Sequence, residues 1–176
     1  MISHSRRSFV TARIVSRFTS PSDVWLAARV LGWACVLPAL KHLMPMKSLV
    51  GMVGRRSRRH QREAGREERI VTFARWACRL TRWKEGGNCL ERGLIVYRFL
   101  GEGGADPTLV VGMSRGHHGR ITGHAWVLID GRPVGESLAS VSAYTPVFAF
   151  GQNGTLCRSF APVDSTDRPS APASSH

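Results

Sequence analysis

Residues 88–100, with the sequence NCLERGLIVYRFL, decide the expected fold, because they predict a buried helix that begins at a cysteine. Asn88 is a favourable N-cap residue, and Glu91 stands three places later, where its carboxylate can accept the N–H of the cap. Cys89 therefore falls in the first turn, beside backbone N–H groups that lack a partner within the helix. The apolar residues expected on the buried face are Leu90, Leu94, Tyr97, Phe99 and Leu100.

The pattern changes from helical to extended after Gly103 and Gly104. Runs of apolar and β-branched residues predict strands, and the pair Asp130-Gly131 predicts the turn of a hairpin. The expected strands are Thr108–Met113, His124–Ile129, Arg132–Glu136 and Tyr144–Phe150, with a Gly/His/Arg loop at Ser114–Gly123. A helix followed by strands indicates an α+β fold, in which the cysteine-bearing helix packs on an antiparallel sheet.

Two further helices are expected ahead of residue 88. The first begins with Ser20 as its cap and Pro21 in its first turn, and Pro38 is expected to stop it. The second covers Glu67–Trp83, where apolar residues recur at helical spacing. The apolar stretch Val30–Leu40 is shorter than the ~20 residues that a membrane span needs. It is therefore expected to be a buried helix, without stable membrane insertion.

A chain of 176 residues suits one compact domain with additional helices. The formal net charge of +13 belongs entirely to residues 1–88 and suits an acidic peptide, an anionic surface or simply a solvated face. Its densest run, residues 55–59, has no interleaved aromatic residue for base stacking, so no nucleic-acid partner is expected. The expected organisation is a basic flexible arm (1–19), an N-terminal helical region with a charged linker (20–66), the core (67–160) and a disordered tail (161–176).

The four cysteines, Cys35, Cys78, Cys89 and Cys157, are widely spaced and form no C-x-x-C pair. This spacing favours a reducing, cytoplasmic setting over a disulfide framework. Cys35 and Cys78 lie within helical apolar stripes, where a cysteine usually acts as a small hydrophobic residue. Cys89 differs from them because it stands at a helix start.

Cys89 and His124 together predict a nucleophilic thiol and its general base. A thiol attacks as the thiolate, which the positive end of a helix dipole and a neighbouring imidazole both stabilise. His124 opens an apolar strand, where a polar residue needs a reason to be present. Either residue alone is more often structural, but the pair favours acyl transfer from a peptide or amide. The N–H of Cys89 can also donate to the oxyanion that develops during attack.

A third residue orients the imidazole in such sites, and two acids follow His124. Asp130 is six strand residues further on, about 20 Å away, which is too far. Glu136 lies on the returning strand, but a two-residue turn places it on the wrong face of the sheet. We expect a three-residue turn over 130–132, which pairs Trp126 with Glu136 and makes Glu136 a diagonal neighbour of His124. Asp130, or no acid at all, stays open as the alternative.

A metal site is not expected. His117 and His118 precede His124 in a Gly-rich loop, but adjacent histidines in an extended segment point to opposite faces. The spacing of zinc ligands is not met. The sequence therefore predicts neither a metal nor another cofactor.

Several segments are jointly similar to the microcin-processing, lasso-peptide biosynthesis B protein family. Trp83 ahead of the cysteine and Tyr144-Thr145-Pro146 after the hairpin are similar as well, and the resemblance covers about residues 70–150. The segments that carry the resemblance are residues 88–94 (NCLERGL), 109–112 (LVVG), 123–127 (GHAWV) and 130–134 (DGRPV).

The resemblance implies a transglutaminase-like, papain-like cysteine peptidase core with a triad at Cys89, His124 and Glu136. It implies a thiol protease, hence a hydrolase, that removes the leader from a ribosomally synthesised lasso-peptide precursor in antibiotic biosynthesis. The implied partners are the precursor peptide, a separate leader-recognition protein and an ATP-dependent, asparagine-synthetase-like cyclase. Two positions depart from the family pattern: the acid is Glu136 instead of Asp, and Gly93 replaces Ser.

Three other functions stay open from the sequence. One is another transglutaminase-like amidase, deamidase or acyltransferase that acts on a small substrate. The second is a catalytically inactive scaffold that presents the precursor to other enzymes, and the third is a basic protein of the membrane surface, which sedimentation with anionic vesicles tests. A lasso precursor and a cyclase encoded beside this chain favour the peptidase over the first, and the effect of Cys89→Ala on leader removal separates it from the second.

Overall fold

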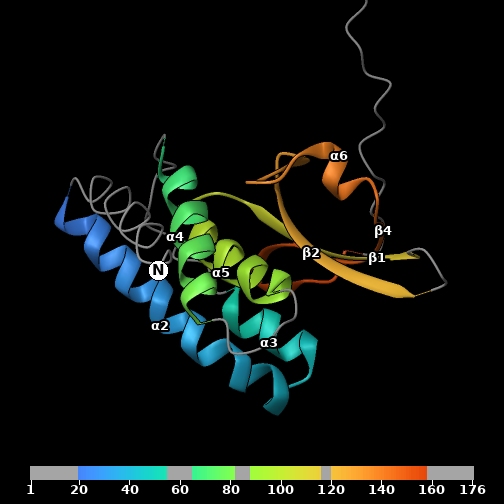
Figure 1. The fold of residues 1–176 in the computed structure, drawn as a ribbon, viewed down its shortest axis with the longest axis horizontal. Coiled ribbons are helices and arrows are strands. Elements are labelled where there is room, and N and C mark those ends of the chain that lie inside the picture. Colours follow the sequence, from blue (N-terminus) through green and yellow to red (C-terminus); the bar gives the residue numbers. More distant parts are fainter. Residues whose placement is uncertain (1–19, 55–64, 82–87, 116–119, 158–176) are drawn as a thin grey trace, which may run out of the picture.

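The computed structural model describes residues 20–54, 65–81, 88–115 and 120–157 (Figure 1). The expected arm at 1–19, the tail at 161–176, the arginine run at 55–59 and the loop histidines at 117–118 lie outside these residues. The elements are α2 (Pro21–Leu43), α3 (Met46–Val53), α4 (Arg66–Leu80), α5 (Cys89–Glu102), β1 (Pro107–Arg115), β2 (Ile121–Ile129), β3 (Arg132–Pro133), α6 (Leu138–Val141), β4 (Thr145–Phe150) and the 3-10 helix η2 (Gln152–Gly154).

A four-stranded antiparallel sheet, in the order β3-β2-β1-β4, carries most of the helices on one face (Figure 1). α5 contacts that face through β1 and β2, and it contacts α2, α3 and α4 on its other sides. Because side chains alternate along a strand, Leu109 and Val127 join the main core with the helices, whereas Val110 and Trp126 pack on the opposite face beside α6. The expected α+β class with N-terminal helices is confirmed.

The helix α2 runs through Pro38 to Leu43, so the expectation that Pro38 stops it is wrong. A proline inside a helix removes one backbone hydrogen bond and crowds the preceding turn. Leu37 is fully buried and Leu40 is partly buried against the core, and this burial offsets the cost. With 23 residues, α2 is long and apolar enough by composition to cross a membrane, while its inner face lies in the protein core. The length of α2 therefore does not exclude a membrane span, and the absence of membrane insertion stays a prediction.

The helix α3 lies within residues 20–66, where the sequence predicts a helix that stops at Pro38 and then a charged linker. Eight residues make a helix that is marginal on its own, so intrinsic propensity does not reveal it. Leu49, Val50 and Val53 are buried, and α3 contacts both α5 and η2. Tertiary packing therefore forms this helix, in a segment whose flanking residues look like a linker.

The hairpin between β2 and β3 has a two-residue turn, so the expected three-residue turn is wrong. Ile129 pairs with Arg132, and the two turn residues between them, Asp130 and Gly131, have φ of 51° and 74°. Asp-Gly suits the two left-handed positions of this turn, whose twist matches that of the strands. The paired strand β3 then ends at Pro133, three residues earlier than expected.

Candidate active site

Cys89 is the first residue of α5, and its surroundings differ from the expected cap. The Asn88 side chain makes no cap hydrogen bond; its amide donates to the carbonyl of Cys78 in α4, at 3.0 Å. The Glu91 carboxylate is buried and binds the ammonium of Lys41 in α2. The helix start that carries the thiol is thus held by α4 and α2.

The edge of β2 is open to the start of α5. Val134 donates to the carbonyl of Val127 at 2.9 Å, so residue 127 directs its backbone groups toward β3. Alternate residues of a strand direct these groups the same way, so those of Gly123 also point to this edge. β3 pairs only with Leu128 and Ile129, well short of Gly123. The Cys89 thiol occupies this position, with Sγ 4.0 Å from the Gly123 carbonyl oxygen.

His124 follows Gly123 and is held from two sides. Its Nε2 lies 2.6 Å from Oε2 of Glu136, so the expected contact between these residues is present. Its ring lies 6.0 Å from the Trp126 ring and 4.9 Å from the Tyr144 ring, measured between centroids. The imidazole side chain is only 17% exposed. Packing and a hydrogen bond together fix its orientation.

Gly112, which pairs with His124 across β1 and β2, makes room for the aromatic wall. A Cβ at this position would lie 2.8 Å from the nearest carbon of the Trp126 ring. The indole can therefore lie over β1 only because residue 112 has no side chain. This glycine belongs to the LVVG segment. The sequence pattern of that segment does not reveal its contact with the aromatic ring beside the imidazole.

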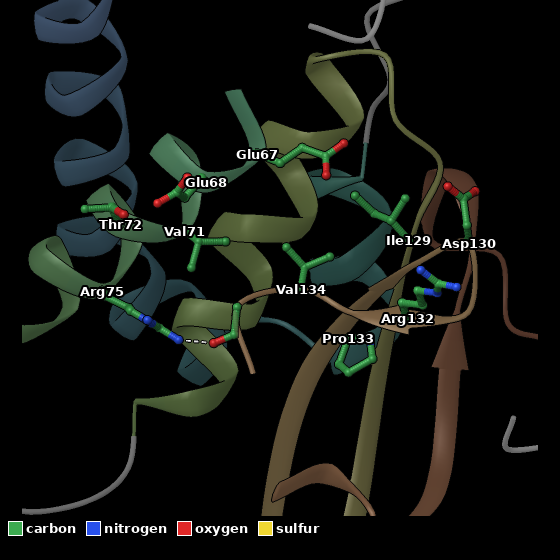
Figure 2. Close-up of a pocket in the computed structure, with 11 residues that line it drawn as sticks. Glu67, Glu68, Val71, Thr72, Arg75, Ile129, Asp130, Arg132, Pro133 and Val134 are labelled. Atoms are coloured by element: carbon green, nitrogen blue, oxygen red, sulfur yellow. Dashed lines mark hydrogen bonds between the residues drawn. The ribbon is translucent and has the colours of Figure 1, made fainter. Parts of the chain in front are cut away.

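Glu136 contacts His124 by a route that the strand argument does not include. Alternation of faces holds only while a strand continues, and here the pairing stops at Val134. Gly135 then adopts a φ of 73°, a left-handed conformation that turns the chain out of the strand and redirects Glu136. The Arg75 guanidinium in α4 donates to the Gly135 carbonyl and holds this turn (Figure 2).

Gly135→Ala is expected to displace Glu136. The new Cβ would lie 2.5 Å from Cγ1 of Val71, at a φ that L residues rarely adopt. We expect the protein to lose about 1–3 kcal/mol of stability and the catalytic activity to fall with it. Thermal denaturation and an activity assay measure the two effects. Gly32→Ala is the matched control, because no atom lies within 4 Å of its Cβ and alanine favours a helix. Unchanged melting temperature and activity in Gly135→Ala would contradict this role.

Glu136 has a second partner that the sequence did not reveal. Nη2 of Arg92 donates to Oε1 of Glu136, while Oε2 faces His124. Arg92 follows Cys89 by three residues, so the two side chains lie on neighbouring turns of one helix face. The three-residue spacing from Cys89 to Arg92 is a signal that the sequence offers. It does not predict a contact with a carboxylate 44 residues away.

The arrangement leaves one ring nitrogen of His124 for proton transfer. A hydrogen bond to Glu136 favours the tautomer with the proton on Nε2, so Nδ1 is left as the acceptor. Within the described residues, the thiol donates to Gly123 and makes no hydrogen bond to the imidazole. Catalytic hydrogen bonds are often long in free enzymes and shorten when substrate binds.

The buried cysteine Cys78 is unsuited to nucleophilic chemistry. Burial raises the pKa of its thiol to about 11, so the thiolate is scarce at neutral pH. Cys35 and Cys157 are exposed. Among the residues that the structure describes, no group of three or more His, Cys, Asp and Glu side chains is placed to hold a metal ion.

A cavity of about 660 Å³ lies beside the Gly135 turn, between α4 and the β2–β3 hairpin (Figure 2). Arg75 and Gly135 form part of its wall, and Asp130 lies at the hairpin end of it, away from His124. Neither Cys89 nor His124 lines it. This cavity therefore lies beside the turn that precedes Glu136, and the Cys89 thiol lies apart from it, at the edge of β2.

The structure thus places a thiol at a helix start, an imidazole on the adjoining strand and an acid beside that imidazole, and these are groups that cysteine-dependent enzymes use. A family model described as the transglutaminase-like superfamily matches residues 33–149, more than half of the chain, and the chain therefore belongs to that superfamily. Cysteine-dependent hydrolases and transferases are frequent in it. No curated protein and no solved structure matches the chain.

The matched region begins within α2 and includes α3. It therefore crosses the boundary that the sequence places between residues 66 and 67. The main hydrophobic core also contains residues from both sides of that boundary, among them Leu37, Val50 and Phe73.

Proposed function

We propose that this chain is a cysteine peptidase that removes the leader from a lasso-peptide precursor. The observation that carries the proposal is the contact of His124 with Glu136, on the strand whose edge binds the Cys89 thiol. Membership of the transglutaminase-like superfamily supports the use of a catalytic thiol. The finer assignment is supported by the similarity of the segments around Cys89, His124 and the hairpin to the lasso-peptide biosynthesis B proteins.

The proposed reaction proceeds in two steps. The Cys89 sulfur attacks the carbonyl carbon that ends the leader, and its proton passes to Nδ1 of His124. The backbone N–H of Cys89 donates to the oxyanion. Collapse breaks the peptide bond, and the departing amine of the core peptide takes the proton from His124. Water, deprotonated by His124, then hydrolyses the thioester and releases the leader with a free carboxylate.

Glu136 serves this reaction by orienting the imidazole. It accepts from Nε2 and stabilises the imidazolium that forms when the thiol proton is transferred. The extra methylene of Glu, compared with the Asp of the similar family, suits an acid that approaches from beyond the end of β3. Because Arg92 and His124 each bind one oxygen of Glu136, the longer side chain does not change the direction in which the carboxylate points.

The proposed partners follow from the same similarity. A separate leader-recognition protein presents the precursor, and the freed core amine becomes the nucleophile that an ATP-dependent, asparagine-synthetase-like cyclase joins to a side-chain carboxyl. The peptidase itself needs no cofactor for thiol chemistry. The proposal places the chain in the cytoplasm, where a reduced thiol persists.

The test is mass spectrometry of the purified chain mixed with the lasso precursor encoded beside it, with and without the leader-recognition protein. We expect one leader fragment and one core fragment, and one atom of ¹⁸O in the leader carboxylate when the solvent is H₂¹⁸O. Loss of ammonia from an intact precursor would instead support an amidase or deamidase. An unmodified precursor in every mixture would contradict the proposal. Precursor incubated without the chain is the control.

A further inference from the structure

We infer that Arg92 is a positioning residue for this site: its guanidinium holds Glu136, and through Glu136 it fixes His124 relative to Cys89. The inference rests on the proposed function, and it adds a fourth residue to the machinery. It also gives a purpose to the arginine of the NCLERGL segment, which neither the helix pattern nor the nucleophile assignment explains.

The contacts form a closed chain that begins and ends at the start of α5. Arg92 binds Oε1 of Glu136, Oε2 of Glu136 lies 2.6 Å from Nε2 of His124, and Gly123, the neighbour of His124, accepts from the Cys89 thiol. Cys89 and Arg92 lie one helical turn apart. Any shift of the strand relative to the helix would therefore alter both ends of the chain together.

The need for Arg92 follows from the backbone around Glu136. This residue lies after the end of β3, so strand pairing does not hold its main chain. The left-handed Gly135, with Arg75 on its carbonyl, sets the direction of the turn but not the direction of the carboxylate. A charge-assisted hydrogen bond to Arg92 sets that direction, and such bonds are stronger and geometrically more demanding than neutral ones.

Partial burial makes this pair more than a surface ion pair. The Arg92 and Glu136 side chains are 30% and 14% exposed, and exposed pairs usually contribute little. The same helix offers a comparison in Arg98, which binds Glu102 at 2.8 Å with 18% and 13% exposure. That pair lies at the far end of α5, so it shares the chemistry and burial of the Arg92 pair but not its place beside His124.

The experiment compares Arg92→Ala, Arg92→Lys, Glu136→Ala and the double variant Arg92→Ala/Glu136→Ala, with Arg98→Ala as the matched control. For leader removal, we expect Arg92→Ala to lower kcat by about 10–100-fold, by analogy with residues that orient the ligands of a metal centre through a hydrogen bond. KM should change far less, because Arg92 is proposed to act through Glu136 and not on the substrate. Arg92→Lys should recover part of kcat, and Arg98→Ala should lower the melting temperature without lowering kcat.

The double variant separates positioning from stability. If Arg92 acts through Glu136, the double variant is no slower than Glu136→Ala alone, because residues that act as a unit are not additive. Additive losses would overturn the inference. So would a kcat that falls only in proportion to the melting temperature, as a purely structural ion pair requires.

A second readout keeps this inference distinct from the proposed function. The rate at which iodoacetamide alkylates Cys89, followed by peptide mapping, needs no peptide substrate. We expect Arg92→Ala and Glu136→Ala to slow it equally, and Arg98→Ala to leave it unchanged. If that pattern holds while no precursor is cleaved, the proposed function fails and the positioning role stands. Equal alkylation rates in all variants would overturn the positioning role.

Discussion

Cys89→Ser is expected to abolish leader removal while the protein stays folded. An alkoxide is far harder to form than a thiolate, so the helix start and the imidazole that suffice for sulfur do not activate a hydroxyl. We expect kcat/KM to fall by at least about 10³-fold, as for the loss of a nucleophile in a hydrolase. Among the residues that the structure describes, the thiol makes one weak hydrogen bond, at 4.0 Å, so the melting temperature should change little.

The controls for this variant are the two exposed thiols, Cys35 and Cys157. Cys35→Ser and Cys157→Ser carry the same change at exposed positions and should keep full activity. Iodoacetamide should inactivate the wild-type chain in step with alkylation of Cys89. Undiminished leader removal by Cys89→Ser would leave only a scaffold or an assisting role for this chain.

His124→Gln is expected to cause the second large loss. Glutamine can keep a hydrogen bond with Glu136, but it cannot take a proton from the thiol or return one to the leaving amine. General acid–base catalysis contributes about 10²–10⁴-fold, and we expect a loss of kcat in that range. Cleavage of the precursor under single-turnover conditions measures it, with folding checked by circular dichroism.

His42→Gln is the matched control, because His42 is an exposed histidine in the last turn of α2, outside the strand that carries His124. It should keep wild-type kinetics. A His124→Gln variant that cleaves within a few-fold of the wild-type rate would mean that another group accepts the thiol proton, and the assignment of His124 as base would then be wrong.

The parts of the fold that follow from local pattern could be predicted from the sequence. The start of α5 at Cys89 is predicted from a residue type that favours caps and from a helical period. The strand through His124 is predicted from an extended apolar run. The helix α3 could not be predicted in this way, since eight residues form a helix here only because their apolar face packs on α5. The helix end predicted at Pro38 is wrong for the same reason, because the burial of neighbouring residues outweighs the tendency of proline to end a helix.

The candidate site shows the same division between local and tertiary information. The sequence predicts Cys89 as nucleophile and His124 as base and favours Glu136 as the acid, and the structure brings Glu136 to His124. The prediction that a three-residue turn makes this contact is wrong. The contact depends instead on the left-handed Gly135 after the short strand β3, and alternation of faces along a strand does not predict such a turn. Arg92 was missed because its partner is distant in sequence and no helical rule names it.

The capping residues illustrate how tertiary contacts replace local ones. Asn88 and Glu91 fit a capping box by type and spacing, yet each binds a different helix. Asn88 donates to the end of α4, and Glu91 binds Lys41 of α2. The first turn of α5 therefore keeps its N–H groups without a side-chain acceptor from Asn88.

The most direct test of the central claim is to trap the acyl-enzyme. The chain and its precursor are mixed for less than one turnover, quenched in acid, digested and examined by mass spectrometry. We predict a thioester on Cys89 whose added mass equals the leader minus one water, absent when Cys89 is alkylated beforehand. Release of the leader with no adduct at Cys89, or with the adduct on another residue, would contradict the account.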